Sequence, residues 1–512
     1  MTSSLIRGRH VVCRVRGRDD VDMIDDGAVY QEDGRIVAVG PYAELARRYE
    51  PDEVLGSPEH VVVPGFVNAH HHVGLTPLQL GSPDHPLELW FASRMAARDV
   101  DPYLDTLYSA FEMIRSGITT VQHLHGRAPA PLARIRGVAD AVIRGYEAVG
   151  MRVSYSFGIR DQNRLVYAAD GDFVASLPAN IAPDVAAFMA RQAIPLADNF
   201  ALFEGLLAAN SGKERVRIQL APANLHWCSD AALEGVRDAC AKHGVPFHMH
   251  VVETQYQKEY ARRRTGTTAV RHLHRLGLLG PHCTIGHGVW LTEDDIDLVA
   301  DTGTCICHNC SSNLRLRSGV AALNVFARKG ITTAIGIDEA GINDDRDMLQ
   351  EMRLVLRQHR VPGMDDQVPT APQVLRMATE QGAATTPFGD LIGTLEPGKA
   401  ADMVLMSWKQ IAHPYLDRDV PIVDAIVQRA KTTGVETVLV AGEAILRDGR
   451  FTRIDEQAAL DELAAMLARP RTPEEERRRD LSRRVFPHVK AFYDGYVPDA
   501  LPEPFYRTSG RF

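Results

Sequence analysis

The feature that most constrains the fold is a repeated order of helix, glycine and short apolar strand between residues 64 and 390. A glycine suits the left-handed backbone position that follows a helix C-terminus. The strands are nearly continuous apolar runs, which is typical of parallel strands covered by helices. Five such units are SAFEMIRSG–ITTVQHLH, IRGYEAVG–MRVSYSF, VRDACAKHG–VPFHMH, DIDLVADTG–TCICH and NVFARKG–ITTAIGID. The repetition predicts an α/β fold with a (β/α)8 TIM-like barrel. A doubly wound sheet is less favoured, because no glycine-rich phosphate loop follows the first strand.

Strand-rich segments stand at both ends of the chain. GAVYQEDGRIVAVG contains an Asp-Gly pair that is typical of a hairpin turn. Similar short strand-forming runs occur near the other end of the chain, in ADMVLMS and GVETVLVAGEAILRDGR. Such segments often pair, so we expect a small β-sandwich made from both the N- and C-terminal segments. The predicted domains are 1–63 and 393–454 for the sandwich, 64–392 for the barrel and 455–512 for a C-terminal, helical extension.

Charge and hydropathy exclude two classes of partner. Lys and Arg number 57 against 66 Asp and Glu, which gives a net charge of −9, and the basic residues form no single block. A nucleic-acid groove is therefore not expected. No apolar run approaches the roughly 20 residues that span a bilayer, so no membrane partner is expected. The N-terminus lacks an apolar secretory segment, which favours a cytoplasmic location.

The seven cysteines are scattered and do not form a disulfide framework. Cys305, Cys307 and Cys310 lie close together around His308, in a run that is typical of a buried strand. No second Cys/His pair follows at zinc-finger spacing. We therefore interpret these residues as buried thiols rather than as a structural zinc site.

Histidines and a glutamate stand at the ends of two predicted strands. VVVPGFVNAHHH ends with His70 and His72, and side chains two residues apart on a strand share one face. Both imidazoles can then reach one metal ion, whereas His71 points the other way. VPFHMHVVE ends a second strand with His250 at its tip and Glu253 in the following loop.

Two more strand ends complete the pattern. His287 ends HCTIGH, and Asp338 ends ITTAIGID. An aspartate at the end of a buried strand is costly unless it is paired or binds a metal. Reactive residues of a parallel barrel gather at its strand ends, and imidazoles with one carboxylate suit zinc or ferrous iron better than magnesium or calcium. The sequence therefore predicts a hydrolase with one divalent ion, zinc first and Fe(II) second.

At these residues the chain resembles the amidohydrolase superfamily, in particular its aminohydrolases of purines, pterins and s-triazines. The resemblance covers residues 1–450, and the pair Ser312–Asn313 is one of its specific signals. Its other motifs are PGFVNAHHH, GITTV, HMHVVET, IGHGVWLTEDD, CHNCSSNLRLRSGVAAL, AIGIDEAGINDDRDMLQEMR, GTLEPGKAADMVL and VETVLVAGE.

The resemblance implies a role for each strand-end residue. One ion would be held by His70, His72, His250 and Asp338. Glu253 and His287 would be catalytic, with Asp338 sharing in proton transfer. No lysine matches the bridging ligand of binuclear relatives, which favours a single ion. The implied reaction replaces an amino group on a nitrogen heterocycle with oxygen, using metal-activated water.

The chain departs from the family pattern where substrates bind. Residues 78–81 read LQLG where many aminohydrolases carry Arg-Gly, and residues 221–227 read APANLHW, without the ribose-contacting histidine of nucleoside deaminases. This favours a small heterocyclic substrate such as a free base, pterin or triazine over a nucleoside. The candidates for lining the pocket are Trp90, His123, His125, Asn224, His226, His308 and Glu339.

Alternatives remain open at this point. The leaving group could be chloride or an alkylamine, or the substrate could be a cyclic amide. A non-enzymatic scaffold is a more remote alternative, because a scaffold has no need for the complete set of ligands and proton carriers. By analogy with the family, we expect a homo-oligomer.

Overall fold

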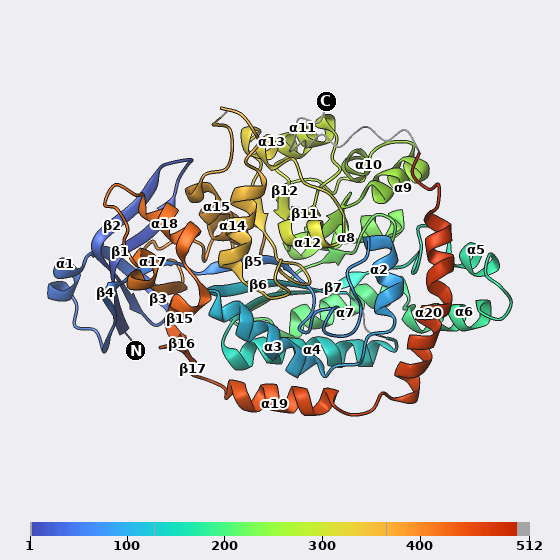
Figure 1. Ribbon diagram of the computed structural model, residues 1–512, viewed down its shortest axis with the longest axis horizontal. Helices are drawn as coiled ribbons and strands as arrows, with labels where there is room; N and C mark the ends of the chain where they lie inside the picture. Colours follow the sequence, from blue (N-terminus) through green and yellow to red (C-terminus); the bar gives the residue numbers. More distant parts are fainter. Residues whose placement is uncertain (1–2, 127–128, 365, 499–512) are drawn as a thin grey trace.

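The computed structural model describes residues 3–126, 129–364 and 366–498 (Figure 1). Two parallel sheets form its centre, one with the order β5-β6-β7-β8 and β9 beside β7, the other with the order β10-β11-β12-β13. The central strands are β5 (Phe66–His71), β6 (Ile118–His125), β7 (Arg152–Ile159), β8 (Val216–Ile218), β9 (Ala221–Pro222), β10 (Phe247–Val251), β11 (Cys283–His287), β12 (Cys305–His308) and β13 (Thr333–Ile335).

Isolated bridges link the two sheets on both sides. Leu220 pairs with Phe247 at one junction, and His71 pairs with Asp338 at the other, both in parallel. All central strands therefore run the same way, and their carboxyl ends lie at one face of the molecule. The α/β class with parallel strands is confirmed.

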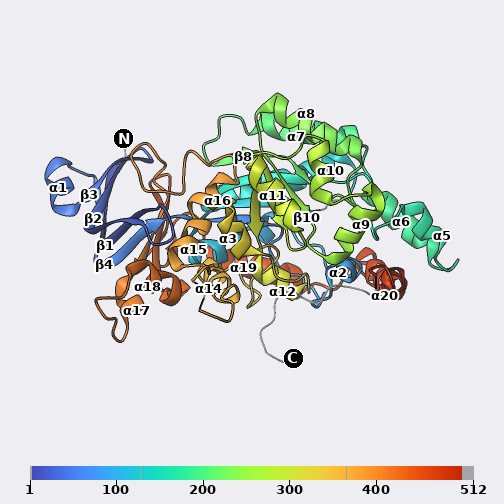
Figure 2. The same cartoon turned by 90° about the horizontal axis from the view of Figure 1, so that it is seen from above.

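Helices alternate with the central strands, as the repeated pattern predicts, and Figure 2 shows them on both sides of the strands. Gly150 and Gly244 end their helices at φ 80° and 64°, where a side chain would be strained. The helices are α2 (Leu87–Arg94), α3 (Pro102–Arg115), α4 (Leu132–Val149), α5 (Asp170–Ala175), α6 (Ala182–Gln192), α7 (Leu196–Ala209), α8 (Asp230–His243), α9 (Gln255–Thr265), α10 (Ala269–Arg275), α11 (Glu293–Thr302), α12 (Cys310–Arg315), α13 (Leu323–Arg328), α14 (Met348–Gln358), α15 (Ala371–Ala378) and α16 (Glu380–Ala384).

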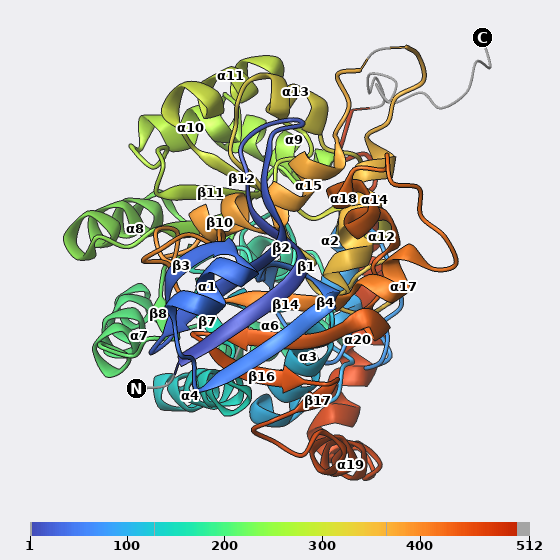
Figure 3. The same ribbon diagram turned by 90° about the vertical axis from the view of Figure 1, so that its left-hand side faces the viewer.

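The two ends of the chain meet in a third sheet, which faces the viewer in Figure 3. Its order is β17-β16-β15-β14-β4-β1-β2-β3, so β4 and β14 join the N-terminal and C-terminal strands. The pairing of both terminal segments is as expected, but they form one continuous eight-stranded sheet, and the two-layered sandwich stays a prediction. The elements are β1 (Ser3–Val15), β2 (Val21–Glu32), β3 (Arg35–Pro41), α1 (Tyr42–Arg48), β4 (Glu53–Pro64), β14 (Met403–Ser407), α17 (Trp408–Ala412), α18 (Ile422–Arg429), η1 (Thr432–Gly434), β15 (Val435–Val440), β16 (Glu443–Arg447) and β17 (Arg450–Phe451).

One buried ion pair connects this sheet with the central strands. Arg152, at the start of β7, donates from Nε to Asp402 Oδ2 at 2.6 Å and from Nη2 to Oδ1 at 3.0 Å. Both side chains are almost fully buried. Asp402 Oδ1 also accepts the main-chain N–H of Ala441 at 2.7 Å.

The C-terminal part contains two helices, α19 (Glu456–Leu467) and α20 (Pro473–Tyr493). The α20 helix begins with a capping box between Thr472 and Glu475 and lies against α2 (Figure 1). Ser482 of α20 donates to the carbonyl of Ala92 in α2 at 2.8 Å. The extension therefore supports the outer side of α2.

All seven cysteines are buried, and none of them forms a disulfide. In the part of the chain that is described, no helix is long and apolar enough to cross a bilayer.

Candidate functional site

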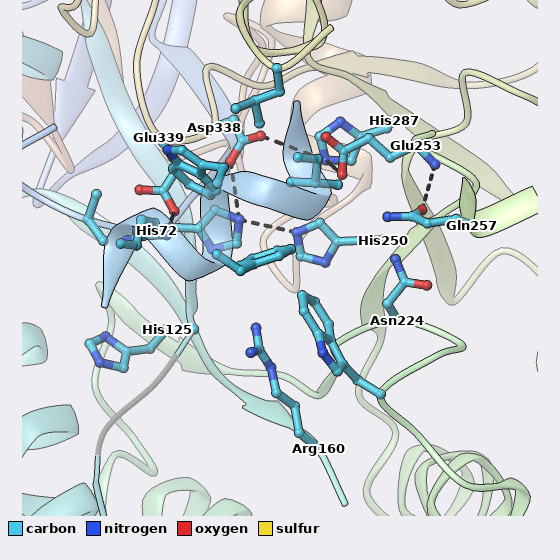
Figure 4. Close-up of a pocket in the computed structure, with 18 residues that line it drawn as sticks. His72, His125, Arg160, Asn224, His250, Glu253, Gln257, His287, Asp338 and Glu339 are labelled. Carbon is cyan, nitrogen blue, oxygen red and sulfur yellow. Dashed lines mark hydrogen bonds and ion pairs between the residues drawn. The ribbon is translucent and has the colours of Figure 1, made fainter. Parts of the chain in front are cut away.

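Three histidines converge through their Nε2 atoms at the carboxyl ends of β5 and β10. His72 Nε2 lies 3.0 Å from His70 Nε2 and 3.2 Å from His250 Nε2. His70 is fully buried, and the other two rings border a cavity (Figure 4). His70 and His72, two residues apart, thus have their Nε2 atoms side by side, and the fold brings His250 next to them.

The other nitrogens of these rings determine which atoms carry protons. His250 Nδ1 donates to the carbonyl oxygen of Ala223 at 2.8 Å, and His72 Nδ1 donates to that of Leu124. A neutral ring protonated at Nδ1 has its lone pair at Nε2. The Nε2 lone pairs of His72 and His250 therefore point towards each other. A cation bound between them would remove their electrostatic repulsion. His70 Nδ1 lies 2.8 Å from His248 Nε2, which orients the third ring.

A carboxylate completes the donor set. Asp338 Oδ1 lies 3.2 Å from His72 Nε2 and 3.7 Å from His70 Nε2. Burial opposes its ionisation, but a protonated His72 ring and the hydroxyl of Ser312, which donates to Oδ2 at 2.7 Å, hold its pKa below the ordinary value. Three imidazole nitrogens and one carboxylate oxygen are a donor set that fits a zinc or ferrous ion.

His287 stands beside this donor set. Its Nδ1 donates to Asn313 Oδ1 at 2.9 Å, so its Nε2 lone pair faces Asp338 Oδ2 at 3.7 Å and Glu253 Oε2 at 3.6 Å. His287 and Asp338 have φ angles of 70° and 64°, which L-residues rarely adopt. Such backbone costs about 1–3 kcal/mol per residue and is typical of functional sites.

Glu253 is a buried carboxyl in contact with His287. Burial raises its pKa well above the ordinary value, and the nearby carboxyls of Asp338 and Glu88 raise it further. The hydroxyl of Ser318 donates to Glu253 Oε1 at 3.1 Å and partly opposes this shift. Glu253 therefore holds a proton at a pH where an exposed glutamate is ionised.

Four of the seven pocket candidates line the cavity next to these residues. Trp90 comes from α2, His125 ends β6, Asn224 follows β9 and Glu339 follows Asp338 (Figure 4). Each of these positions is a strand end, a loop, or a helix over the strand ends.

The other three candidates lie elsewhere, and we correct their assignment as lining residues. His123 lies behind His125 and contacts the hydroxyl of Tyr146 at 2.9 Å. The ring of His226 stacks on Tyr167 with centroids 4.0 Å apart. The structure also pairs His308 Nε2 with His359 Nε2 at 2.9 Å. All three rings are buried, and none of them borders the cavity.

Sequence reasoning missed several lining residues: Phe91, Arg94, Arg160, Trp227 and Gln257. Phe91 and Arg94 share α2 with Trp90, and their spacing places them on neighbouring positions of one helix. Arg160 directly follows β7, so its position at a strand end was the available signal. Gln257 accepts the main-chain N–H of Glu253 at 2.8 Å and so fixes the loop that carries this carboxyl.

Comparison with known proteins assigns the family. Residues 61–445 match the amidohydrolase family, and residues 27–49 match an imidazolonepropionase-like composite domain of bacteria. The chain is 30% identical over 439 residues to a 5-methylthioadenosine/S-adenosylhomocysteine deaminase of Desulfitobacterium hafniense, covering 85% of this chain and 92% of that protein.

Solved structures agree with this assignment. An adenosine deaminase from Xanthomonas campestris with bound zinc superposes with a TM-score of 0.77 at 26% identity, covering 94% of this chain and 99% of that chain. A zinc-containing atrazine chlorohydrolase from Arthrobacter aurescens TC1 has a TM-score of 0.76 at 21% identity, covering 91% and 100%, a likeness that concerns the fold alone. The family and these neighbours imply a TIM-type barrel with an additional domain. Because the match covers most of the chain, this protein belongs to the amidohydrolase family and is a hydrolytic enzyme acting on C–N bonds.

Proposed function

We propose that the protein is a metal-dependent aminohydrolase that replaces an amino group on a nitrogen heterocycle with oxygen. The observation that carries this proposal is the contact between two kinds of group. A donor set of His70, His72, His250 and Asp338 lies next to a carboxyl, Glu253, whose pKa is raised by burial. Deamination of a ring needs both an activated water and an acid that protonates the ring.

One divalent ion, most simply zinc, would be held by the three Nε2 atoms and by Asp338. When bound, such an ion acts as a Lewis acid and makes a coordinated water acidic near neutral pH. The donor chemistry supports zinc or ferrous iron, and both solved neighbours named above contain zinc.

The chain's own residues then move the protons. His287 Nε2 and Asp338 Oδ2, 3.7 Å apart, can orient the water and accept its proton. Glu253 delivers its proton to a ring nitrogen, which makes the adjacent carbon electrophilic. The carbon–oxygen bond forms, and the ionised Glu253 takes the proton of the newly bound hydroxyl group and passes it to the amino group. The carbon–nitrogen bond then breaks to release ammonia, and the water proton held by His287 and Asp338 returns to Glu253.

The architecture supports this assignment of roles. We propose that β5 to β13 close into a (β/α)8 barrel through the bridges at Leu220–Phe247 and His71–Asp338. Reactive groups of such barrels lie at the carboxyl ends of the strands. The four donor residues, Glu253 and His287 all lie there. The domain limits 1–63, 64–392, 393–454 and 455–512, the homo-oligomer and the cytoplasmic location stay predictions.

The substrate is proposed to be a free base, pterin or triazine. Ala223 occupies the position at which nucleoside deaminases carry their ribose-contacting histidine, and Trp90, Phe91 and Trp227 give the cavity flat aromatic walls. The relative at 30% identity is named for nucleoside substrates, so 5-methylthioadenosine belongs in every substrate panel.

The test measures ammonia release from aminated purines, pyrimidines, pterins, triazines and 5-methylthioadenosine by zinc-loaded protein. We expect release from one ring class. Glu253→Gln should keep about one metal per chain and lose about 10²–10⁴-fold in kcat. Glu234→Gln, at an exposed position of α8, is the matched control and should behave as wild type. A fully active Glu253→Gln protein would refute the proton-transfer role, and silence across the panel would refute deamination.

A further inference from the structure

The short helix α12 supports two groups of the proposed proton transfer. Ser312 donates from its hydroxyl to Asp338 Oδ2 at 2.7 Å. The next residue, Asn313, accepts from His287 Nδ1 at 2.9 Å through its Oδ1. Because Ser312 and Asn313 are consecutive in α12, a shift of this helix would disturb both hydrogen bonds together. The position of α12 therefore determines how the two proton acceptors, Asp338 and His287, are oriented.

The N-terminus of α12 receives no cap from the residue before it. The first N–H groups of a helix have no partner within the helix, and the side chain of the preceding residue commonly accepts from one of them. Asn309 occupies that position, but its side chain makes no capping hydrogen bond. Its amide nitrogen lies 3.3 Å from His287 Nε2 instead. A partner for these N–H groups therefore has to come from another element.

Glu351 of α14 supplies an acceptor at this place. Its Oε1 accepts the main-chain N–H of Ser311 at 3.0 Å, and α12 packs against α14 (Figure 3). The side chain of Glu351 is buried, and it does not border the cavity that Asp338 and His287 line. Glu351 can thus act on these catalytic groups through α12, without touching a substrate.

The carboxyl group of Glu351 changes its charge near neutral pH. Burial raises its pKa to about 7, against the lowering effect of the Ser311 N–H, and the charge of Asp345 adds to the rise. Its own charge also acts on the thiols of Cys307 in β12 and Cys310 in α12, whose pKa values burial raises. An ionised acceptor forms a hydrogen bond roughly twice as strong as a neutral one. Ionised Glu351 therefore holds α12 more firmly than the protonated form does.

We propose that Glu351 is a positioning residue of the catalytic site, which holds the N-terminus of α12 through the main chain of Ser311. Through this helix it keeps Asp338 and His287 in the orientation that proton transfer needs. The assignment rests on the proposed aminohydrolase function, in which these two side chains accept the proton of the water. Glu351 should act on kcat rather than on KM, because the aromatic walls of the cavity come from other elements.

The experiment compares Glu351→Gln and Glu351→Ala with wild type, all loaded with zinc. The glutamine keeps an acceptor for the Ser311 N–H but never carries a charge, whereas the alanine removes the acceptor. Ammonia release from the best substrate of the panel gives kcat and KM from about pH 5.5 to about pH 8.5, on both sides of the pKa of Glu351. Amide hydrogen exchange of residues 310–315 is measured at the same pH values. Zinc content and melting temperature show that each variant is loaded and folded.

We expect Glu351→Gln and wild type to have nearly equal kcat at about pH 5.5, where both side chains are neutral. At about pH 8.5 the kcat of wild type should be about three- to tenfold higher, and exchange in residues 310–315 should be slower in wild type. Glu351→Ala should lose kcat at both pH values with KM nearly unchanged. Glu234→Gln, at an exposed position of α8, is the matched control and should follow wild type throughout. Because each comparison is made at one pH, the titration of other groups affects both proteins alike.

A second background tests the route through α12. Ser312→Ala with Asn313→Ala removes both hydrogen bonds by which α12 acts on Asp338 and His287. Glu351→Gln should then cause no further loss of kcat at high pH, because its effect depends on these two bonds. A full additional loss would overturn the role of α12.

The outcomes separate this proposal from the proposed function. A ratio of kcat between wild type and Glu351→Gln that does not change with pH, or an effect confined to KM, overturns the role of Glu351 and leaves deamination standing. If wild type releases no ammonia from any compound of the panel, deamination is overturned. A pH-dependent difference in exchange between wild type and Glu351→Gln would then still support the hold of Glu351 on α12, and equal exchange would overturn it.

Discussion

The rings of His72 and His250 face each other through Nε2 atoms that lie 3.2 Å apart, while Nδ1 of each ring donates to a main-chain carbonyl. Because both Nδ1 atoms carry protons, neither Nε2 can donate to the other in the neutral state. The main chain of Leu124 and Ala223 thus prepares two lone pairs for one cation. A core of hydrogen-bonded histidines would instead alternate donors and acceptors.

This arrangement predicts that the metal stabilises the folded protein. Removal of the ion by a chelator should lower the melting temperature and abolish ammonia release, and zinc should restore both. His250→Ala should bind well under one zinc per chain, as measured by elemental analysis. His274→Ala changes an exposed histidine of α10 and should keep the metal. Full zinc content in His250→Ala would exclude this histidine as a ligand.

The hydroxyl of Ser318 should set the upper pH limit of activity. It donates to Glu253 Oε1 at 3.1 Å and stabilises the charged carboxylate, which lowers the pKa of Glu253. Removal of this bond in Ser318→Ala should raise that pKa further. Because Glu253 acts in its protonated form, the high-pH limb of kcat/KM should move to higher pH. The measurement is a pH profile of the variant against wild type.

Ser211→Ala, at an exposed position, is the control for this profile and should not shift it. A high-pH limb that stays in place, or moves to lower pH, in Ser318→Ala would show that Glu253 is not the group that titrates there.

The strand-end residues could be predicted because their positions depend on local rules. A spacing of two places His70 and His72 on one face, and parallel strands bring their carboxyl ends together. The direction of a loop side chain follows no such rule. His226 lies at a predicted strand end, yet its ring packs against Tyr167 and does not border the cavity.

The cavity wall could not be predicted for a related reason. Phe91 and Trp227 lie more than a hundred residues apart in sequence, and their rings meet edge to face at 5.0 Å. This contact depends on how α2 is placed over the strand ends, which the α20 helix from the other end of the chain helps to determine. The single terminal sheet likewise depends on the pairing of β4 with β14. The sequence indicates that both segments are strands, but it does not indicate which residues pair.

Breaking the buried pair of Arg152 and Asp402 should destabilise the protein strongly. Both side chains are at most 1% exposed, so Arg152→Met leaves an uncompensated charge in the interior. We expect a loss of about 3–5 kcal/mol in the free energy of unfolding, seen as a lower denaturation midpoint. The double variant Arg152→Met with Asp402→Leu should recover part of this loss.

Arg9→Met removes the partner of Glu59 in an exposed pair at 3.9 Å and should cost no more than about 1 kcal/mol. Equal effects of Arg9→Met and Arg152→Met would show that burial does not determine the strength of these pairs.

The C-terminal extension should act on substrate binding through α2. Ser482 of α20 donates to the carbonyl of Ala92, and α2 carries Trp90, Phe91 and Arg94 into the cavity wall. Ser482→Ala removes a hydrogen bond that stabilises the position of α2 by about 1 kcal/mol. The substitution removes no contact of the metal ligands. We therefore expect KM to rise several-fold with kcat nearly unchanged, and amide hydrogen exchange to accelerate within residues 87–94. Arg483→Ala, exposed on the same helix, should leave KM and exchange as in wild type. A fall in kcat at constant KM would instead place the effect of α20 on the catalytic groups.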